Sequence, residues 1–494
     1  MNLRILWIWS SAVCLGLGGL QAQETKSEVD ELKRRLKEAQ DNFQKAVDQH
    51  HALIDSLNKR LQTLEQRQTA ATNTPMPSPA PVPVASAPPN VAPPAVVRPV
   101  PGGSEVPAWS ASQPIPLLRA GPAYMNISFD TLFDAGWSTA PDPSAELNLG
   151  GHDPLQRGFS LPNAEIALDG AVDPYFRAFA NIVFFLDKDQ ETQVELEEAY
   201  LQSTALPANL QLKAGQFYAN FGRQNPQHPH QWGFVDAPLT LTRAFGPDGL
   251  RNPGAQISWL APTPFYTEAF LGILNGQGGT AFSFRNPGEP DPLGIDRVHG
   301  RATTDHGISS PGDLLYTPRL AVSFDLTDQQ TLLVGASAAF GANDTGPHER
   351  TEIYGGDLYW KWKSARANQG FPFVALQAEG LYQQFEAGAD SSAGLPRETL
   401  RDWGLYSQVL WGFKPRWVAA LRGDWVDGNT GAADATDPFR GWRWRFSPAL
   451  TWYPSEFSKI RLQYNYDQGE LFGEEQSIWL QVEFLLGSHG AHKF

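Results

Sequence analysis

Residues 442–486 alternate apolar and polar side chains with a two-residue period. A β-strand points successive side chains to opposite faces, so this segment predicts strands with one apolar, aromatic face and one polar face. The apolar set comprises Trp442, Trp444, Phe446, Leu450, Trp452, Ile460, Leu462, Tyr464, Tyr466, Ile478, Leu480, Val482, Phe484 and Leu486. A soluble sandwich would bury this face in a core. An outer-membrane barrel would turn it to lipid and line a lumen with the polar face.

Residues 1–22 have the pattern of a secretory signal peptide. Arg4 precedes an apolar run from Ile5 to Leu20, and Ala22 offers a small residue for cleavage. No stretch reaches the ~18 apolar residues that a retained membrane helix needs. The chain's one cysteine, Cys14, lies in the apolar run, so we expect no disulfide and no thiol chemistry in the mature protein.

Residues 23–69 predict a coiled-coil helix, and residues 70–117 predict a proline-rich linker. Apolar residues recur at spacings of three and four, with charged and amide side chains between them, as a coiled coil requires. A single amphipathic helix is the alternative. Fourteen prolines lie between Pro75 and Pro116, and such a segment stays extended because it cannot bury enough apolar surface to fold. We expect both segments in the periplasm.

Residues 118–494 predict an all-β fold: a closed antiparallel transmembrane β-barrel of about 16 strands. The strand-like runs start near Tyr124, Asn163, Tyr175, Gln193, Asn209, Gly254, Phe265, Leu315, Gln330, Thr351, Phe373, Asp402, Trp417, Gly441, Lys459 and Gln476. Short connections alternate with long ones, as they do in outer-membrane barrels, and a soluble sandwich has no reason for this alternation. Two connections depart from the pattern, since the outer one near Asp187 is short and the inner one at Lys363–Phe371 is longer than a tight turn.

Charge and motifs exclude several classes of function. The formal net charge of −15 argues against nucleic acid as a partner. The sequence has no Gly-x-Ser-x-Gly elbow, no His-Glu-x-x-His and no glycine-rich phosphate loop, so we predict no enzyme activity, no catalytic residues and no cofactor.

The mature chain resembles the porins of the phosphate-selective O/P type. The resemblance lies in the segments Val194–Leu201, Leu212–Phe217, Phe221–Gly222, His228–His230, Phe234–Asp236, Gly249, Gly254–Gln256 and Gly490–Phe494. The His-Pro-His and Phe-Val-Asp portion also resembles barrels described as zinc-regulated outer-membrane receptors. The porin resemblance implies a sixteen-stranded, trimeric, passive channel.

The charge of the barrel region departs from what phosphate selectivity requires. Residues 118–494 hold 27 Lys and Arg against 43 Asp and Glu, and only seven of the basic residues are lysines. A pore concentrates ions whose charge is opposite to that of its lining. We therefore do not extend phosphate selectivity to this chain.

The long segment Gln216–Pro253 is the expected constriction, because it is long enough to fold into the lumen. Opposed charges there would set a field across the pore, although solvated loop charges are the alternative interpretation. The candidates on this segment are Arg223, Asp236, Arg243, Asp248 and Arg251, and the polar parity of the C-terminal strands adds Arg443, Arg445 and Arg461. Glu195, Glu197 and Glu198 require either a change of face or a β-bulge.

His228 and His230 are weak candidates for metal ligands, because two histidines are an incomplete set. The sequence as a whole favours an outer-membrane porin for small hydrophilic or ionic solutes. We expect it to contact outer-membrane lipid and to form a homotrimer, with a possible cell-wall contact through the N-terminal helix. The alternatives are a metal-related receptor and a structural anchor whose coiled coil tethers the membrane to the cell wall.

Overall fold

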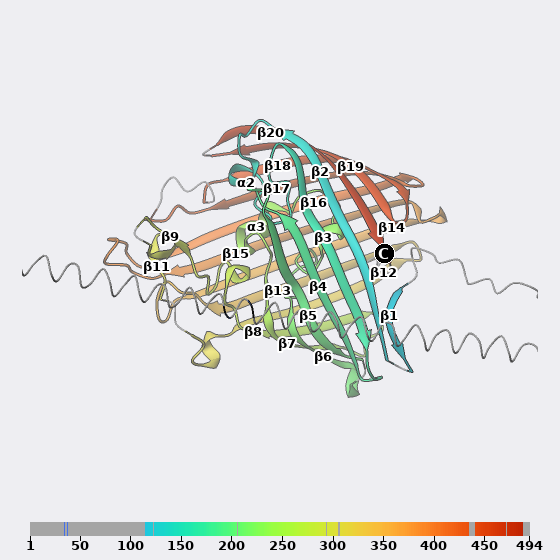
Figure 1. Ribbon diagram of the computed structural model, residues 1–494, viewed down its shortest axis with the longest axis horizontal. Coiled ribbons are helices and arrows are strands. Elements are labelled where there is room, and N and C mark those ends of the chain that lie inside the picture. Colours follow the sequence, from blue (N-terminus) through green and yellow to red (C-terminus); the bar gives the residue numbers. More distant parts are fainter. Residues whose placement is uncertain are drawn as a thin grey trace, which may run out of the picture. The chain divides into compact units, whose positions relative to one another are not determined.

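The computed structural model is almost entirely β-structure (Figure 1). It describes residues 34, 37, 114–121, 123–204, 206–292, 294–304, 307–433, 440–470 and 472–487, without the side chains of residues 145 and 146. The chain divides into two units, Met1–Gly102 and Gly103–Phe494, and the strands all belong to the second. The predicted signal peptide, the coiled-coil helix except Arg34 and Lys37, and residues 70–113 of the linker lie outside the described residues.

Sixteen antiparallel strands close into a barrel, as the sequence predicts. They belong to a sheet of 17 strands, whose remaining member, β1 (Ile115–Ala120), pairs with β2 alone. Pairing of β20 with β2 and of β8 with β12 completes the ring. The barrel strands are β2 (Ala123–Ser138), β3 (Gly158–Ala171), β4 (Phe176–Leu186), β5 (Thr192–Ser203), β6 (Leu210–Tyr218), β7 (Arg251–Leu260), β8 (Tyr266–Leu274), β12 (Leu315–Thr327), β13 (Gln330–Ala342), β14 (Arg350–Asn368), β15 (Phe371–Ala387), β16 (Glu398–Lys414), β17 (Trp417–Gly428), β18 (Arg443–Ser455), β19 (Ser458–Gly469) and β20 (Gly473–Leu486).

The connections confirm the alternation of short turns and long loops, with one correction. The inner connection expected to be long, Lys363–Phe371, is a two-residue turn, because Asn368 of β14 pairs with Phe371 of β15. Gln369 and Gly370 both adopt positive φ, which is the backbone of a type I′ hairpin turn. Short turns therefore mark one end of the barrel, called here the turn end. The other end carries the long loops and two short connections, the expected one near Asp187 and that between Gly469 and Gly473.

The long loops carry the remaining elements. Helices α2 (Pro143–Glu146) and α3 (Leu239–Phe245) and the short 3-10 helices η2 (Pro229–Gln231), η3 (Gly279–Ala281) and η4 (Pro311–Asp313) lie in them, whereas η1 (Pro207–Asn209) lies in a turn. Strands β9 (Glu289–Pro290), β10 (Asp296–Val298) and β11 (Arg301–Ala302) form a small separate sheet. No helix among the described residues is both long and apolar enough to cross a membrane.

The outer face of the barrel carries the apolar parity of the C-terminal strands. In β20, Ile478, Leu480, Val482 and Phe484 are exposed, while Ser477, Gln481 and Glu483 between them are buried. The same alternation holds in β18 and β19. A closed barrel with an apolar outer band is the architecture of an outer-membrane protein.

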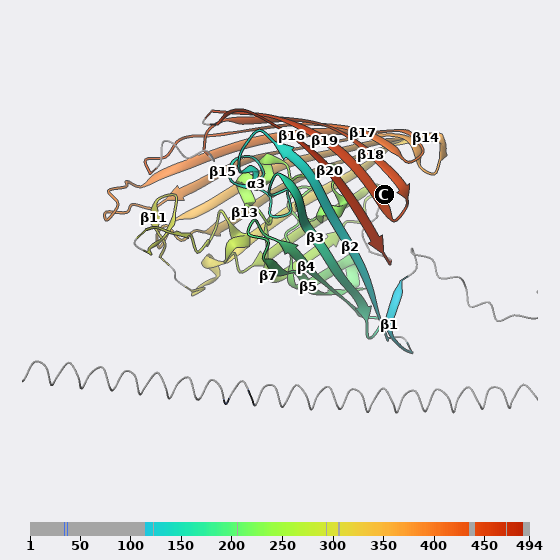
Figure 2. The same ribbon diagram turned by 45° about the horizontal axis from the view of Figure 1, so that its top comes forward.

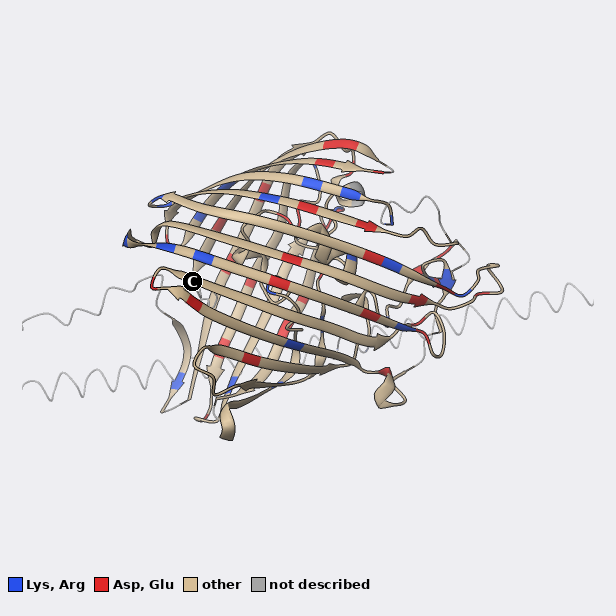
Figure 3. Ribbon diagram, turned by 180° about the vertical axis from the view of Figure 1, so that it is seen from behind, with Lys and Arg blue, Asp and Glu red and all other residues tan. Residues whose placement is uncertain are grey.

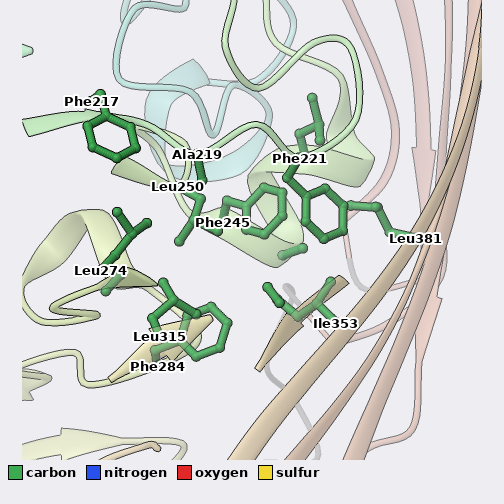
Figure 4. Close-up of a cluster of buried hydrophobic side chains, with 14 residues drawn as sticks. Phe217, Ala219, Phe221, Phe245, Leu250, Leu274, Phe284, Leu315, Ile353 and Leu381 are labelled. Atoms are coloured by element: carbon green, nitrogen blue, oxygen red, sulfur yellow. The ribbon is translucent and has the colours of Figure 1, made fainter. Parts of the chain in front are cut away.

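One side of the lumen is filled by apolar side chains (Figure 4). Phe221, Leu241 and Phe245, from the segment between β6 and β7, pack against the inward-facing Ile353 and Leu381 of the barrel wall. The rings of Phe221 and Phe245 meet edge to face with centroids 5.0 Å apart. Burying each such side chain contributes about 1.5–3 kcal/mol, so this cluster fixes the segment inside the barrel.

We predict that a charge on the lipid-facing parity destabilises the barrel. Leu480 lies near the middle of β20 and is 42% exposed, so Leu480→Arg should reduce the free energy of unfolding in lipid vesicles by about 2–4 kcal/mol. Glu456→Arg, in the turn between β18 and β19, is the control and should change it by less than about 0.5 kcal/mol. Equal effects of the two substitutions in a urea titration would contradict this orientation of β20.

Candidate functional site

Residues 219–250, called the inner loop, fold into the lumen between β6 and β7. Figures 1 and 2 show its helix α3 among the barrel strands. Most of its residues are buried, and it bonds to side chains on strands far apart in the ring. Gly222 N donates to Ser337 Oγ of β13 over 3.1 Å, and Leu239 N donates to Asp424 Oδ1 of β17 over 3.1 Å. The expected entry of this segment into the lumen is thus what the structure shows.

A buried carboxylate of the barrel wall binds the first residues of the inner loop. Glu379 of β15 accepts hydrogen bonds from the backbone N–H groups of Arg223, over 3.0 Å, and Gln224, over 2.8 Å. Gly222 turns the chain there with φ +61°, and a side chain at this position would collide with the Glu379 carboxylate. The Arg223 guanidinium then lies 3.9 Å from the centre of the Tyr359 ring, and only partly buried.

Asp236 is the point where the inner loop meets the basic wall of the barrel. Its Oδ1 lies 2.6 Å from Arg422 of β17, and its Oδ2 lies 2.6 Å from Arg445 of β18. The side-chain amides of Gln463 and Asn465 each donate to the same carboxylate over 2.9 Å. Burial opposes the charge, but the two arginines outweigh it and lower the pKa of Asp236 to about 2.

The other basic residues of this wall bind the inner segments through oxygen atoms. Arg461 of β19 donates to the carbonyl oxygens of Trp232, over 2.7 Å, and Phe234, over 2.9 Å. Arg443 and Arg445 both lie 2.8 Å from Asp467, and both donate to the carbonyl oxygen of Leu147 in the loop between β2 and β3. All three arginines face the lumen, as their parity predicts.

The histidines of the inner loop meet an acidic wall on the other side. His228 lies 2.8 Å from Glu197 and 3.0 Å from Glu198, both on β5. Burial disfavours the charged imidazole, but the surrounding carboxylates, Glu165 and Glu197 foremost, raise the pKa of His228 well above its usual value. Pairing of β4 with β5 shifts register between Asn181 and Ile182, and this bulge lets Glu197 and Glu198 both face inward.

A second segment, residues 139–157, also enters the lumen. His152 lies 3.1 Å from Glu197, and its Nδ1 bonds the carbonyl oxygen of Pro162 over 2.9 Å. Burial disfavours its charge, but Glu197 raises the pKa of His152 to about 9. Between this segment and the inner loop lies a cavity of about 40 Å³, which His152, Tyr218, Asp248 and Trp232 help to line. This volume holds roughly two or three water molecules.

The ion pairs of the inner loop differ from those expected. Arg243, Arg251 and Asp236 were expected to face charges on the same segment, but each pairs with the barrel wall. Arg243 lies 3.0 Å from Asp402 of β16, and Arg251, at the start of β7, pairs with Glu195 of β5. Asp248 lies at the cavity, where it contributes to the raised pKa of His152. The loop therefore links the walls electrostatically, instead of carrying a field of its own.

The partners of these residues were largely missed by sequence reasoning. Arg422 and Asp424 share the lumen parity of β17, between the outward-facing Leu421 and Trp425, and that alternation was the available signal. Asp402, Glu379 and Asp467 lie on equally regular strands. For His152, in a loop, no comparable signal existed.

Three groups of histidine and carboxylate side chains bring ligand atoms within 4.8 Å of one another. They are Asp130, Glu165 and His230; Glu165, Glu197 and His228; and His152, Glu195 and Glu197. The structure thus brings together His228 and His230, the two weak metal candidates, with the carboxylates that an N/O metal site requires.

Known proteins resemble this chain in fold and in sequence. No family model matches the chain. An uncharacterized protein of Aquifex aeolicus (strain VF5) is 32% identical over 378 residues, which cover 71% of this chain and 74% of that protein. The chain belongs to the same family as this Aquifex protein.

Solved structures extend the likeness to outer-membrane channels. The match to the outer membrane channel DcaP of Acinetobacter baumannii covers 75% of this chain and 100% of DcaP, with a TM-score of 0.53 and 10% sequence identity. The match to an anion-selective porin from Comamonas acidovorans covers 74% of this chain and 100% of that porin, with a TM-score of 0.47 and 8% sequence identity. The likeness to DcaP shows a shared barrel fold. Membership of the phosphate-selective O/P type stays a prediction.

We predict that Asp236→Asn loosens the inner loop. It removes the negative charge that Arg422 and Arg445 share. Asp424 and Asp467 remain as their other partners, so the loss of these buried bonds should cost about 1–3 kcal/mol in the free energy of unfolding. Urea unfolding of the purified protein measures this loss. Asp325→Asn, at an exposed position near the turn end, is the matched control and should cost less than about 0.5 kcal/mol. A loss that is the same for both variants would show that the pairing with Arg422 and Arg445 adds no stability.

We predict that the contribution of His152 to stability falls as pH rises. Its folded-state pKa of about 9 exceeds the usual 6.5, so the contribution is complete below about pH 6.5 and is lost as pH rises through 9. The groups facing His152 are Glu195, Glu197, Asp248 and the ring of Phe185. The difference in unfolding free energy between wild type and His152→Gln should be largest near pH 6 and vanish above pH 9. A difference independent of pH would show that His152 is not charged in the folded protein.

Proposed function

We propose that this protein is a porin, a passive diffusion channel for small hydrophilic solutes and ions across the outer membrane. The observation that carries the proposal is the inner loop inside a sixteen-strand barrel. A barrel of this size has a bore wide enough for an aqueous channel, and a loop folded into it narrows the passage. The shared fold with DcaP, which is described as an outer membrane channel, supports the proposal.

The charges of the lumen favour cations over anions. Among the described residues of the barrel and its loops, fifteen carboxylate side chains and ten Lys and Arg side chains are buried, and the charged His152 and His228 reduce the excess of negative charge to three. Both signs lie on the strands throughout the wall, as Figure 3 shows. Because a pore raises the local concentration of ions opposite to its net charge, an acidic lumen attracts cations. A phosphate-selective lumen would need the reverse balance.

Opposite charges also gather on opposite sides of the inner loop. Its histidines meet the carboxylates of β3 and β5, while Asp236 meets the arginines of β17 and β18. Solutes that pass the loop would cross the field between these walls, and Arg223, partly exposed above Tyr359, is the basic residue of the loop best placed to meet them. We extend the proposal to a homotrimer, which the heptad pattern of residues 23–69 supports.

We predict stepwise ion conductance from the full-length protein in planar lipid bilayers. In a KCl gradient, the reversal potential should have the sign of cation preference, and Arg223→Gln should move it further in that direction because it removes a positive charge from the lumen. Arg416→Gln, at an exposed turn-end position, should leave it unchanged.

Two results would contradict this proposal in different ways. A folded barrel with no conductance would overturn the porin function. Conductance with an anion-selective reversal potential would leave the porin function intact and overturn the cation preference.

A further inference from the structure

Asp130, Glu165 and His230 converge inside the barrel from three separate elements. Asp130 lies on β2, Glu165 on β3 and His230 in η2 of the inner loop, and all three side chains are buried. One ligand atom of each lies within 4.8 Å of the other two. Two ligands thus come from the wall, and the third comes from the loop that crosses the lumen.

The wall contributes two carboxylates that face each other directly. Asp130 and Glu165 are register partners in the pairing of β2 with β3. Like charges directly opposite each other across two strands are destabilising, and burial increases the repulsion between them. Such a pair requires a compensating positive charge.

The histidines of the inner loop supply part of that compensation at Glu165, but Asp130 receives less. Asp130 is 0% exposed, and neither of its carboxylate oxygens has a hydrogen-bond partner among the described residues. Glu483, on the adjacent strand β20, already pairs with Lys459. Among the described residues, no basic side chain therefore bonds to Asp130.

The distance from the loop to the wall matches metal coordination. His230 Nδ1 lies 3.3 Å from Glu165 Oε2. Two ligands of a tetrahedral zinc ion, each about 2.0–2.1 Å from the metal, are roughly 3.3 Å apart, whereas a charge-assisted hydrogen bond is about 2.7–2.9 Å long.

We propose that Asp130, Glu165 and His230 bind one divalent transition-metal ion, with Zn²⁺ the best match. One imidazole and two carboxylates suit zinc and its first-row neighbours, whereas Mg²⁺ and Ca²⁺ prefer oxygen ligands alone. Three protein ligands leave a fourth position that water can fill, as in zinc sites that keep one position open.

The neighbouring histidine serves as a positioning residue. His228 binds Glu197 through Nδ1 and Glu198 through Nε2, and its ring stacks on that of His230 with centroids 5.7 Å apart. It thereby fixes the turn that presents His230 to the wall. The metal ion would then join the inner loop to β2 and β3 and hold the loop across the lumen. A loop held in this way would reduce the passage of ions. That effect rests on the proposed porin function, whereas the binding of the metal ion does not.

The first test measures binding in the full-length, EDTA-treated protein in detergent. Titration with ZnCl₂ in a calorimeter and elemental analysis after dialysis should show one Zn²⁺ per chain. Asp130→Asn, Glu165→Gln and His230→Gln should each weaken Zn²⁺ affinity by about tenfold or more, because each removes a ligand. His348→Gln, at an exposed histidine, is the matched control and should leave it unchanged.

The outcome is decided even if a variant fails to fold. Asp130→Asn keeps the shape of the side chain and removes a repelling charge, so it should fold at least as well as wild type. Folded wild-type protein that retains no Zn²⁺, or an Asp130→Asn barrel that binds it as tightly as wild type, would overturn the site.

The second test measures conductance with ZnCl₂ alone as the added ligand. Zn²⁺ should reduce the conductance of wild type in planar bilayers, EDTA should restore it, and Asp130→Asn should not respond. Binding without any change in conductance would overturn the effect of the metal ion on the passage of ions, while the site stands. Absence of conductance even without Zn²⁺ would overturn the porin function, not the metal site.

Discussion

The contact on which the lumen depends is the buried carboxylate of Asp236 between Arg422 and Arg445. It fixes the middle of the inner loop to strands β17 and β18, and the rest of the loop follows from that attachment. Only Ala237 and Pro238 separate it from α3, which packs against β15, β16 and β17. At most seven residues separate it from His228 and His230 at the acidic wall. A buried ion pair adds little net stability, because desolvation offsets the attraction, but it strongly disfavours any arrangement that leaves one partner alone. The pairs therefore specify where the loop lies more than they stabilise it.

Apolar packing provides the stability that the ion pairs do not. The cluster around Phe221, Phe245, Ile353 and Leu381 is a small hydrophobic core inside a membrane barrel (Figure 4). The inner loop thus has one face held by burial of apolar surface, and it has two sites, His228 to His230 and Asp236, held by charges of opposite sign. Such a loop is rigid where it packs and adjustable where its charges meet titratable groups or cations. This division places the histidine contacts at the part of the loop most able to respond to conditions.

The sequence predicted the barrel because the two-residue period and the loop lengths are local properties. All sixteen strands and the lumen parity of Arg443, Arg445 and Arg461 follow from that period alone. Leu274, Leu315 and Ile353 are apolar but face inward, where they pack on the inner loop, and the two-residue period does not predict this contact. Pairings such as Asp236 with Arg445 join residues 209 positions apart, and no local pattern records them. The turn at Gln369 and Gly370 was missed because its signal lies in backbone dihedral angles rather than in polarity.

The excess of buried carboxylates connects the two proposals. Fifteen buried carboxylates against ten buried Lys and Arg side chains and the charged His152 and His228 leave an excess of negative charge while all of them are ionised. Arginines neutralise the wall at β17 to β19, but among the described residues none bonds to Asp130, which faces Glu165 across the pairing of β2 with β3. Mobile cations in the passage and one Zn²⁺ bound by Asp130 and Glu165 would both offset this excess of negative charge, at different places in the lumen. A lumen that attracts cations would also raise the local concentration of the metal ion beside the site that binds it.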